Sequence, residues 1–408
     1  MAATDPLRAL FTRHGREVSV HDLRASFDYL SADEIYFDSA CQTLRPRPVI
    51  EALTTYYTTH NACGDRVKYA WGRRVAEGVE TTRDRVLDAW KLPARRYSCS
   101  FTLNTTYGLN LLLQQLPQRR FARVVTTHSE HNAVFLSTLT AAARLGVPRV
   151  LVERDATGAV ATTDAELTDA VVVVSAMDNV TGTLTAGLAG LVSRAHERGG
   201  IVIVDAAQAA PHALTSLRGL PADAICFSAH KMYGPSLGVV IATDELLASL
   251  ELSFVGGGQV SEVTADGFAL DTVLHTRLEP GLQAWGEILA FGAALTWLSP
   301  RLEDIERAEA RLSARLFEGL AALPRLRLLG EVASPVMSAV PERVDAHRLA
   351  VFLSRAGVMV RSGYFCAHHW LQERAGLPPL IRFSVGAHNT DGDVDRALEL
   401  MSRMMRGL

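Results

Sequence analysis

The chain has 408 residues, and 48% of them are hydrophobic, which is enough for a large core and more than one lobe. A formal net charge of −3 and dispersed arginines predict neither a nucleic-acid-binding nor a membrane-binding surface, and no apolar run reaches the ~18 residues needed to span a bilayer. Five cysteines at irregular spacing and an N-terminus without a signal-peptide pattern indicate a cytoplasmic protein with free thiols.

The N-terminal part predicts short elements before the regular pattern begins. Residues 7–30 favour a helical lead-in, and Tyr36–Ala40 a short strand and turn. A helix is expected to start at the prolines of 45–48, followed by a polar, glycine-containing loop over 61–71. Valines at helical spacing then predict a helix over about 73–90.

From residue 97, strands and helices alternate. Continuous apolar runs of about five residues separated by helices are typical of a parallel sheet covered on both faces. The predicted strands are 98–103, 123–127, 149–152, 171–174, 201–205, 224–227 and 238–242. The expected fold is therefore α/β, with a large, mainly parallel seven-stranded sheet.

The pattern changes after about residue 285. A long helical region over 285–321 is followed by short strands and helices, which predicts a smaller α+β lobe. Its strands are expected at 326–329, 336–340, 358–361 and 382–385, and its helices at 345–355 and 391–406. We therefore expect an N-terminal lead-in (1–30) that packs with the small lobe, a large domain (31–283) and a small C-terminal domain (284–408).

Lys231 occupies an unusual position among the three lysines of the chain. It follows a strand in the sequence Ser228-Ala229-His230-Lys231, and the turn closes with Gly234-Pro235. A buried lysine has a lowered amine pKa and can form a Schiff base with an aldehyde. On this stretch alone, an ordinary loop lysine is an equally good interpretation.

Other polar residues fall at the carboxyl ends of predicted strands, where ligands gather in open α/β sheets. Asp205 ends an apolar strand and Gln208 follows one turn later. A buried aspartate needs a partner, and a protonated pyridine nitrogen, as in pyridoxal phosphate, is one. The alternative is an aspartate that caps the next helix.

A phosphate group is a second expectation at these strand ends. Thr105 and Thr106 precede a helix start, where hydroxyl and backbone N–H groups can hold phosphate, although N-capping explains one threonine equally well. Ser228 and His230 can add donors. His131 follows a strand and can stack on a flat ring, although a lone histidine is more often structural.

Two other interpretations lack support. His128 and His131 have no third ligand at a suitable spacing, so no metal site is predicted. Gly256–Gly258 lacks the strand-turn-helix context of a nucleotide-binding loop and is interpreted as a flexible loop, which leaves a nucleotide-binding enzyme without its glycine-rich motif.

Together, these motifs resemble the class V aminotransferase superfamily of pyridoxal-phosphate enzymes with fold type I, and within it the cysteine desulfurase / selenocysteine lyase family. The resemblance covers nearly the whole chain. Its motifs are Asn104-Thr105-Thr106, Ser129-Glu130-His131-Asn132, Asp178-Asn179-Val180-Thr181-Gly182, Asp205-Ala206-Ala207-Gln208, Ser228–Pro235 and Arg361–Ala367.

The resemblance implies roles around the cofactor. Lys231 would carry the Schiff base and act as general base, Asp205 would pair with the pyridine nitrogen, and Gln208 would lie near the ring hydroxyl. His131 would stack on the ring, and Thr105, Thr106, Ser228 and His230 would hold the phosphate.

The resemblance also implies roles toward the substrate. Asn179, Arg361 and Arg382 would bind it, with Arg382 as a bidentate fork for the carboxylate. Cys366 would attack the substrate sulfur as a thiolate and become a persulfide. An inert loop thiol is the alternative for Cys366.

Several positions depart from the pattern of this family. Asp65 and Tyr69 replace histidines of the 61–71 loop, and Tyr364 and Phe365 replace two histidines before the cysteine. Leu282 replaces a threonine that reaches the phosphate of the partner subunit.

Gln283 or a residue of the Gly256–Gln259 loop is the candidate substitute donor for that threonine. The departures leave the cofactor residues intact and change the substrate side.

The expected function is a pyridoxal-phosphate-dependent, cysteine desulfurase-like enzyme, a homodimer acting on L-cysteine or a cysteine-derived small molecule, with a sulfur-acceptor protein as a further partner. The alternatives are a carbon–sulfur β-lyase of a cysteine conjugate, an epimerase-like relative in specialised metabolism, and a degenerate scaffold in a sulfur-transfer complex.

Overall fold

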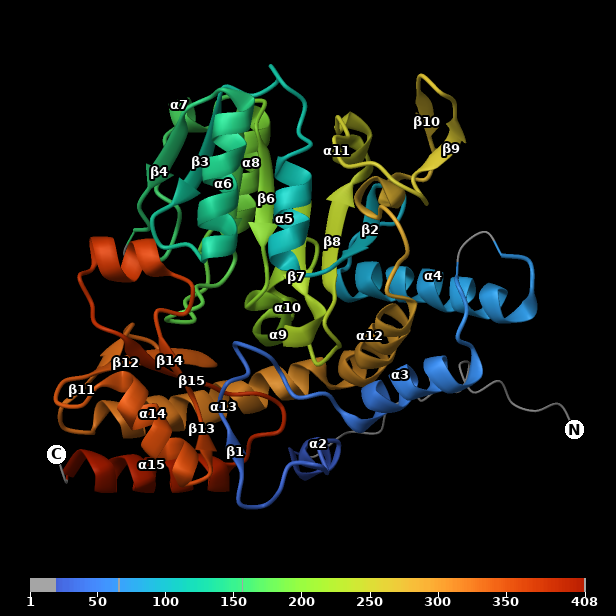
Figure 1. The fold of residues 1–408 in the computed structure, drawn as a ribbon. Helices are drawn as coiled ribbons and strands as arrows, with labels where there is room; N and C mark the ends of the chain where they lie inside the picture. The colour runs from blue at the N-terminus through green and yellow to red at the C-terminus, as the bar shows by residue number, and fades with distance from the viewer. Residues whose placement is uncertain (1–19, 65–66, 156, 407–408) are drawn as a thin grey trace, which may run out of the picture.

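The computed structural model describes residues 20–64, 67–155 and 157–406 (Figure 1). Its largest element is a seven-stranded sheet in the order β2-β8-β7-β6-β5-β3-β4. The strands are β2 (Tyr97–Thr102), β3 (Arg123–Thr127), β4 (Arg149–Val152), β5 (Ala170–Ser175), β6 (Ile201–Asp205), β7 (Ala224–Ser228) and β8 (Gly238–Thr243). β8 runs in the direction opposite to the other six strands, so its pairs with β2 and β7 are antiparallel. The expected α/β fold with a mainly parallel seven-stranded sheet is confirmed.

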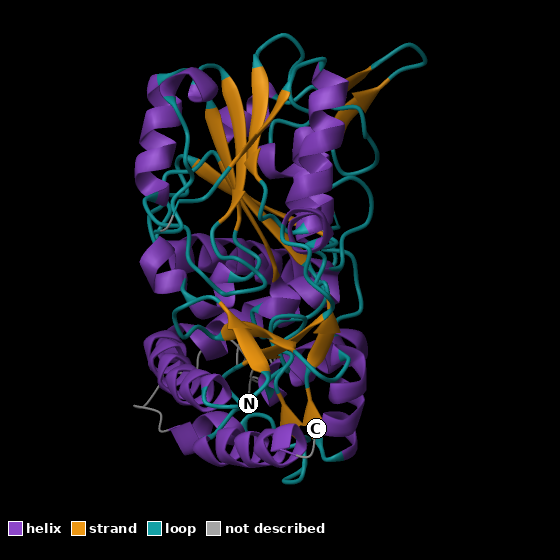
Figure 2. Ribbon diagram, turned by 90° about the vertical axis from the view of Figure 1, so that its left-hand side faces the viewer, coloured by secondary structure: helices purple, strands orange, loops and turns teal. Residues whose placement is uncertain are grey.

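Helices cover both faces of this sheet, as Figure 2 shows. Neighbouring residues of β5 belong to different clusters, since Val171 and Val173 lie in the core on one face and Val172 and Val174 in the core on the other. This explains the continuous apolar runs, because both faces of a covered strand are buried. One face carries α5 (Thr105–Leu113), α6 (Asn132–Leu145) and α11 (Asp244–Ser249), and the other α4 (Ala70–Trp90), α7 (Asp164–Leu167), α8 (Leu188–Glu197), α9 (Ala209–His212), α10 (Leu214–Leu217) and α12 (Trp285–Leu298).

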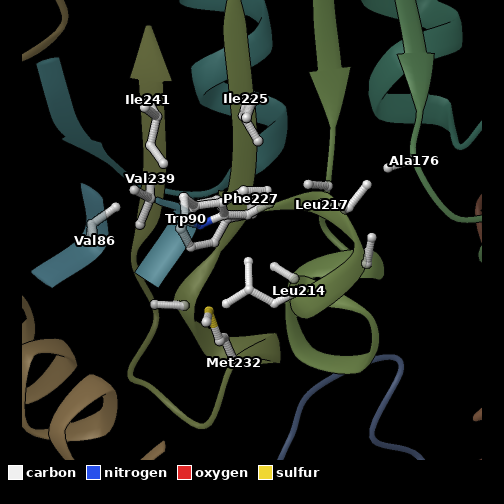
Figure 3. Close-up of a cluster of buried hydrophobic side chains, with 14 of the residues drawn as sticks. Val86, Trp90, Ala176, Leu214, Leu217, Ile225, Phe227, Met232, Val239 and Ile241 are labelled. Carbon is white, nitrogen blue, oxygen red and sulfur yellow. The ribbon is translucent and has the colours of Figure 1, made fainter. Parts of the chain in front are cut away.

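Aromatic packing fixes the end of β7 that leads to the lysine turn. Trp90 of α4 and Phe227 of β7 are nearly inaccessible, with ring centroids 5.4 Å apart. Met232 lies in the same cluster, next to Leu214 (Figure 3). The turn that follows β7 is therefore anchored in the large core.

The C-terminal domain contains a four-stranded antiparallel sheet in the order β11-β12-β15-β14. Its elements are α13 (Leu302–Ala321), β11 (Leu326–Leu329), β12 (Val336–Pro341), α14 (Ala346–Arg355), β13 (Val358–Met359), β14 (Arg361–Gly363), β15 (Leu380–Ser384) and α15 (Asp391–Arg406). The prediction of one strand over 358–361 was wrong. β13 pairs with β1 (Ile35–Tyr36), whereas β14 pairs with β15, so the segment changes partners at residue 360.

The N-terminal segment crosses to this domain. Residues 7–19 of the predicted lead-in lie outside the described residues; α2 (Val20–Ala25) and α3 (Arg47–Thr59) follow. Arg24 donates to the backbone oxygen of His388 at 2.9 Å and pairs with Asp393 at 3.2 Å.

A hairpin of β9 (Val260–Val263) and β10 (Phe268–Leu270) was not predicted, and it projects from the large domain (Figure 1). Within the described ranges, no helix is both long enough and apolar enough to cross a bilayer.

Candidate active site

A cavity of about 680 Å³ opens at the carboxyl ends of the large sheet. Segments of both domains line it, because strand ends of the sheet form one side and residues of the C-terminal domain the other. All twelve predicted site residues line this one cavity: Thr105, Thr106, His131, Asn179, Asp205, Gln208, Ser228, His230, Lys231, Arg361, Cys366 and Arg382. Residues up to 277 positions apart in the sequence thus meet at one site, as the resemblance implied.

Lys231 ends a short 3₁₀ turn, η1 (Ala229–Lys231), directly after β7. The next two side chains are buried, and Tyr233 has a φ of 60°, which is strained for a non-glycine residue. The Tyr233 N–H donates to Thr43 Oγ1 at 2.8 Å, and its hydroxyl donates to Glu309 Oε1 at 3.0 Å. The backbone that carries Lys231 is thus fixed by contacts from two distant segments.

The environment of Lys231 favours the neutral amine. Burial lowers the pKa of Lys231, and the nearby Arg382 acts in the same direction, while the negative charge of Asp205 opposes them. A neutral amine is the form that attacks an aldehyde or accepts a proton.

Asp205 and Gln208 present unused polar atoms where a heteroaromatic ring would bind. Asp205 is 4% exposed; one carboxylate oxygen accepts the Ala207 N–H at 2.9 Å, and burial raises its pKa to about 6. Gln208 donates to the Ala40 carbonyl at 2.8 Å, but its own Oε1 is buried without a partner in the described parts of the chain. A buried acceptor needs a donor and a buried carboxylate needs a cation, so this pair fits a hydroxyl-bearing, protonated pyridine ring.

The N-terminus of α5 fits a phosphate. Asn104 caps the helix by accepting the Tyr107 N–H at 2.9 Å, and Thr105 contacts Ser228 Oγ through both its N–H (2.9 Å) and its hydroxyl (2.6 Å). The exposed Thr106 also lines the cavity. Gly238 allows the backbone of Asn104 to lie close to the start of β8, because a Cβ at residue 238 would lie 2.6 Å from the Asn104 nitrogen.

The two cavity histidines are electrically neutral. Burial, reinforced by the positive charge of Lys231, lowers the pKa of His131 to about 3 and that of His230 to about 4. His131 Nδ1 also accepts the Ala133 N–H at 3.0 Å at the start of α6. A neutral imidazole whose orientation is fixed suits stacking on a flat ring.

The substrate side centres on Arg382, which is 4% exposed. It donates to the Asn179 carbonyl at 3.1 Å and to Asp38 Oδ1 at 3.3 Å, while its Nε lacks a partner among the described residues. Arg382 thus has protein acceptors already, and a substrate carboxylate must share or displace them.

Cys366 lies in a strained and anchored loop. Phe365 and Cys366 have φ values of 48° and 58°. The Asn179 side chain donates to the Phe365 carbonyl at 2.7 Å, and the Asn132 N–H donates to the Cys366 carbonyl at 2.6 Å. The backbone is held while the cysteine itself is exposed, so Asn179, expected to bind substrate, here positions this loop.

Two residues of the site were missed in the sequence. Asp38 binds Arg382, and Cys41 lines the cavity with its sulfur 3.1 Å from Arg361 Nη1. Asp38 lies within the predicted strand and turn Tyr36–Ala40 and Cys41 directly follows it, so a polar residue and a thiol at this turn were the available signal. All five cysteines of the chain are free thiols.

The residues that depart from the family pattern lie in different parts of the structure. Asp65 lies outside the described residues, whereas Tyr69 is an exposed residue preceding α4. Leu282 is 77% exposed. Gln283 and Gly258, considered as substitutes for it, line a separate cavity of about 350 Å³.

Comparison with known proteins gives a consistent result. A family model described as aminotransferase class-V matches residues 35–397. The chain is 30% identical over 399 residues to the cysteine desulfurase CsdA of Escherichia coli (93% of this chain, 97% of the relative). It is 31% identical over 383 residues to a probable cysteine desulfurase of Pseudomonas aeruginosa (91% and 93%).

Solved structures give the same picture. An apo cysteine desulfurase from Thermococcus onnurineus superposes with a TM-score of 0.88 at 28% identity, covering 97% of this chain and all of the other. The Escherichia coli CsdA structure gives a TM-score of 0.86 at 26% identity, with 96% of this chain and all of the other covered.

Proposed function

Because the chain belongs to the class-V aminotransferase family of pyridoxal-phosphate enzymes, we propose that it is a cysteine desulfurase-like enzyme acting on L-cysteine or a cysteine derivative. The expected family, fold, enzyme class and cofactor are confirmed. The substrate and the roles of individual residues are proposed from the site itself.

Pyridoxal phosphate supplies an aldehyde that bonds to amines and a ring that withdraws electrons from the substrate α-carbon. In the proposed site, Lys231 would hold the cofactor through its aldehyde, and Asp205 would lie toward the ring nitrogen. Gln208 Oε1 would accept from the ring hydroxyl. The N-terminus of α5, with Thr105, Thr106, Ser228 and His230, would hold the phosphate.

Lys231 also moves the proton of the reaction. When its amine is free, Lys231 would take the α-proton of the substrate, and its lowered pKa increases the share of the neutral form that can do so. The substrate carboxylate lies against Arg382, with Arg361 at the same wall of the cavity.

The observation that carries the proposed reaction is that Cys366 and Lys231 line the same cavity. The Cys366 thiolate attacks the substrate sulfur, and the substrate C–S bond breaks. The electron pair of that bond takes up the proton that the Cys366 thiol gave up and becomes a C–H bond of alanine, and Cys366 retains the sulfur as a persulfide. We further infer a cytoplasmic homodimer that passes this sulfur to an acceptor protein.

Product analysis tests this proposal. Purified enzyme incubated with L-cysteine is expected to form alanine and a persulfide on Cys366. The Cys366→Ala variant is expected to keep the cofactor absorbance and lose alanine formation by at least ~10³-fold. Cys63→Ala, which removes an exposed thiol elsewhere, is the control and keeps full activity.

Other products would identify the alternatives. Pyruvate and ammonia, formed equally by Cys366→Ala, indicate a β-lyase. Inversion of the α-carbon without C–S cleavage indicates an epimerase, and no turnover of any cysteine derivative despite a bound chromophore indicates a scaffold.

A further inference from the structure

A second thiol, Cys41, lies on the wall of the same cavity as Cys366. Its backbone N–H donates to the Asp38 carbonyl at 3.0 Å. The preceding residue, Ala40, donates to Ser384 Oγ and accepts from Gln208, both at 2.8 Å. Cys41 is therefore held between the cofactor side of the site and the C-terminal domain.

Cationic groups surround this thiol. Arg361 Nη1 donates to Cys41 Sγ at 3.1 Å and lies 3.8 Å from Asp38 Oδ2. Arg382 pairs with the other Asp38 oxygen at 3.3 Å, and its buried Nε lacks a partner among the described residues. A guanidinium that donates to sulfur stabilises the thiolate, which is the nucleophilic form of cysteine.

The two thiols are linked through one short segment. Arg361 and Cys366 are the ends of the stretch 361–366, so the side chain that contacts Cys41 belongs to β14, the strand that leads directly into the loop that carries Cys366. Both thiols line the cavity that Lys231 also lines. A sulfur atom released beside Lys231 therefore has two thiols around it.

We propose that Cys41 is a second sulfur-accepting thiol, which takes the sulfur atom from the Cys366 persulfide; this rests on the proposed desulfurase function. The Cys41 thiolate attacks the outer sulfur of Cys366–S–SH. The new Cys41 Sγ–S bond forms as the Cys366 Sγ–S bond breaks, and its electron pair remains on Cys366 as a thiolate. The proton stays on the transferred sulfur, and neither oxidant nor reductant is consumed.

This transfer predicts a stoichiometry. It frees Cys366 for another attack, so each subunit can store two sulfur atoms before an acceptor or reductant is needed. Without Cys41, the first persulfide blocks further turnover.

The test is a rapid-quench measurement of the alanine burst with L-cysteine and holoenzyme, in the absence of reductant. The wild type is expected to release about two alanines per cofactor, and Cys41→Ala about one. Arg361→Gln would not test the transfer alone, because Arg361 is also predicted to bind the substrate. Cofactor absorbance and thermal unfolding show that Cys41→Ala is folded and loaded, and Cys63→Ser is the matched control with the wild-type burst.

Peptide mapping of the quenched protein identifies the thiol that carries sulfur. The extra sulfur is expected on Cys366 and Cys41 in the wild type. In Cys366→Ala, Cys41 is expected to carry no extra sulfur. A burst of one in both wild type and Cys41→Ala overturns the transfer, as does wild-type labelling of Cys41 in Cys366→Ala. If the wild type forms no alanine and Cys366 carries no sulfur, the proposed function itself fails and the transfer with it.

Discussion

The two sides of the cavity are built in different ways. On the cofactor side, Asp205 and Ser228 are the last residues of neighbouring strands, and both are at most 4% exposed. On the substrate side, Cys366 is exposed in a loop with positive φ values, and Arg382 comes from a separate four-stranded sheet.

This difference suggests that one side of the cavity determines cofactor binding and the other determines substrate specificity. Strand ends in a packed sheet have little freedom, so the cofactor side can keep one geometry while the loop around Cys366 varies. The departures Tyr364 and Phe365 fall in that loop. Substitutions on the cofactor side should therefore remove all chemistry, whereas those on the substrate side should change rate, affinity or product.

The largest effect is expected at Lys231. Lys231→Ala removes both the aldehyde bond and the base, so alanine formation should fall by at least ~10³-fold and the visible absorbance of the bound cofactor should shift. Lys91→Asn is the matched control, because this exposed residue has a φ of 54°, which asparagine tolerates. Substantial activity in Lys231→Ala would remove the basis for the comparison between the two sides.

A smaller loss is expected for Asp205→Asn, which keeps the shape of the side chain but not its charge. The rate should fall about 10²–10³-fold, because the ring nitrogen loses the carboxylate that keeps it protonated. Stopped-flow absorbance with L-cysteine and thermal unfolding of the same variant separate this effect from misfolding. An unchanged rate would show that Asp205 does not face the ring.

Arg382→Lys tests the substrate side. Lysine keeps the charge but cannot bind Asp38 and a carboxylate with a planar fork, so KM for L-cysteine should rise ~10-fold with the cofactor spectrum unchanged. Steady-state kinetics give the result. A lost cofactor spectrum with an unchanged KM would instead assign Arg382 to the cofactor side.

The last effect concerns stability at acid pH and leaves the reaction itself unchanged. Burial lowers the pKa of His388 to about 4, so the unfolded chain binds a proton that the folded protein does not. The contribution of neutral His388 is fully present above about pH 6.5 and is lost as pH falls toward 4, by up to ~3 kcal/mol. Urea unfolding at pH 7 and pH 5 should show a smaller difference for His388→Gln than for the wild type.

His347→Gln, the same substitution at an exposed ring, is the matched control. An equally steep decline in His388→Gln and the wild type would assign the acid sensitivity to other groups.

The sequence predicted the cofactor side better than the substrate side. β3, β4 and β6 have the predicted bounds, and Asp205 was found because it directly follows the apolar run of β6. By contrast, the pairing of Asp38 with Arg382 joins residues 344 positions apart, which no local pattern encodes. The change of partner at residue 360 was missed for the same reason.

The turn after β7 also limits movement. Tyr233 is tied to Thr43 and Glu309, and its hydroxyl oxygen accepts the Ala387 N–H at 2.9 Å. These contacts restrain the main chain beside Lys231, so in the proposed mechanism its amine would move mainly by rotation of the four-carbon side chain. The side-chain torsions of Lys231 thus set how far its Nζ atom can reach. The substrate α-carbon must bind within that reach for its proton to be transferred.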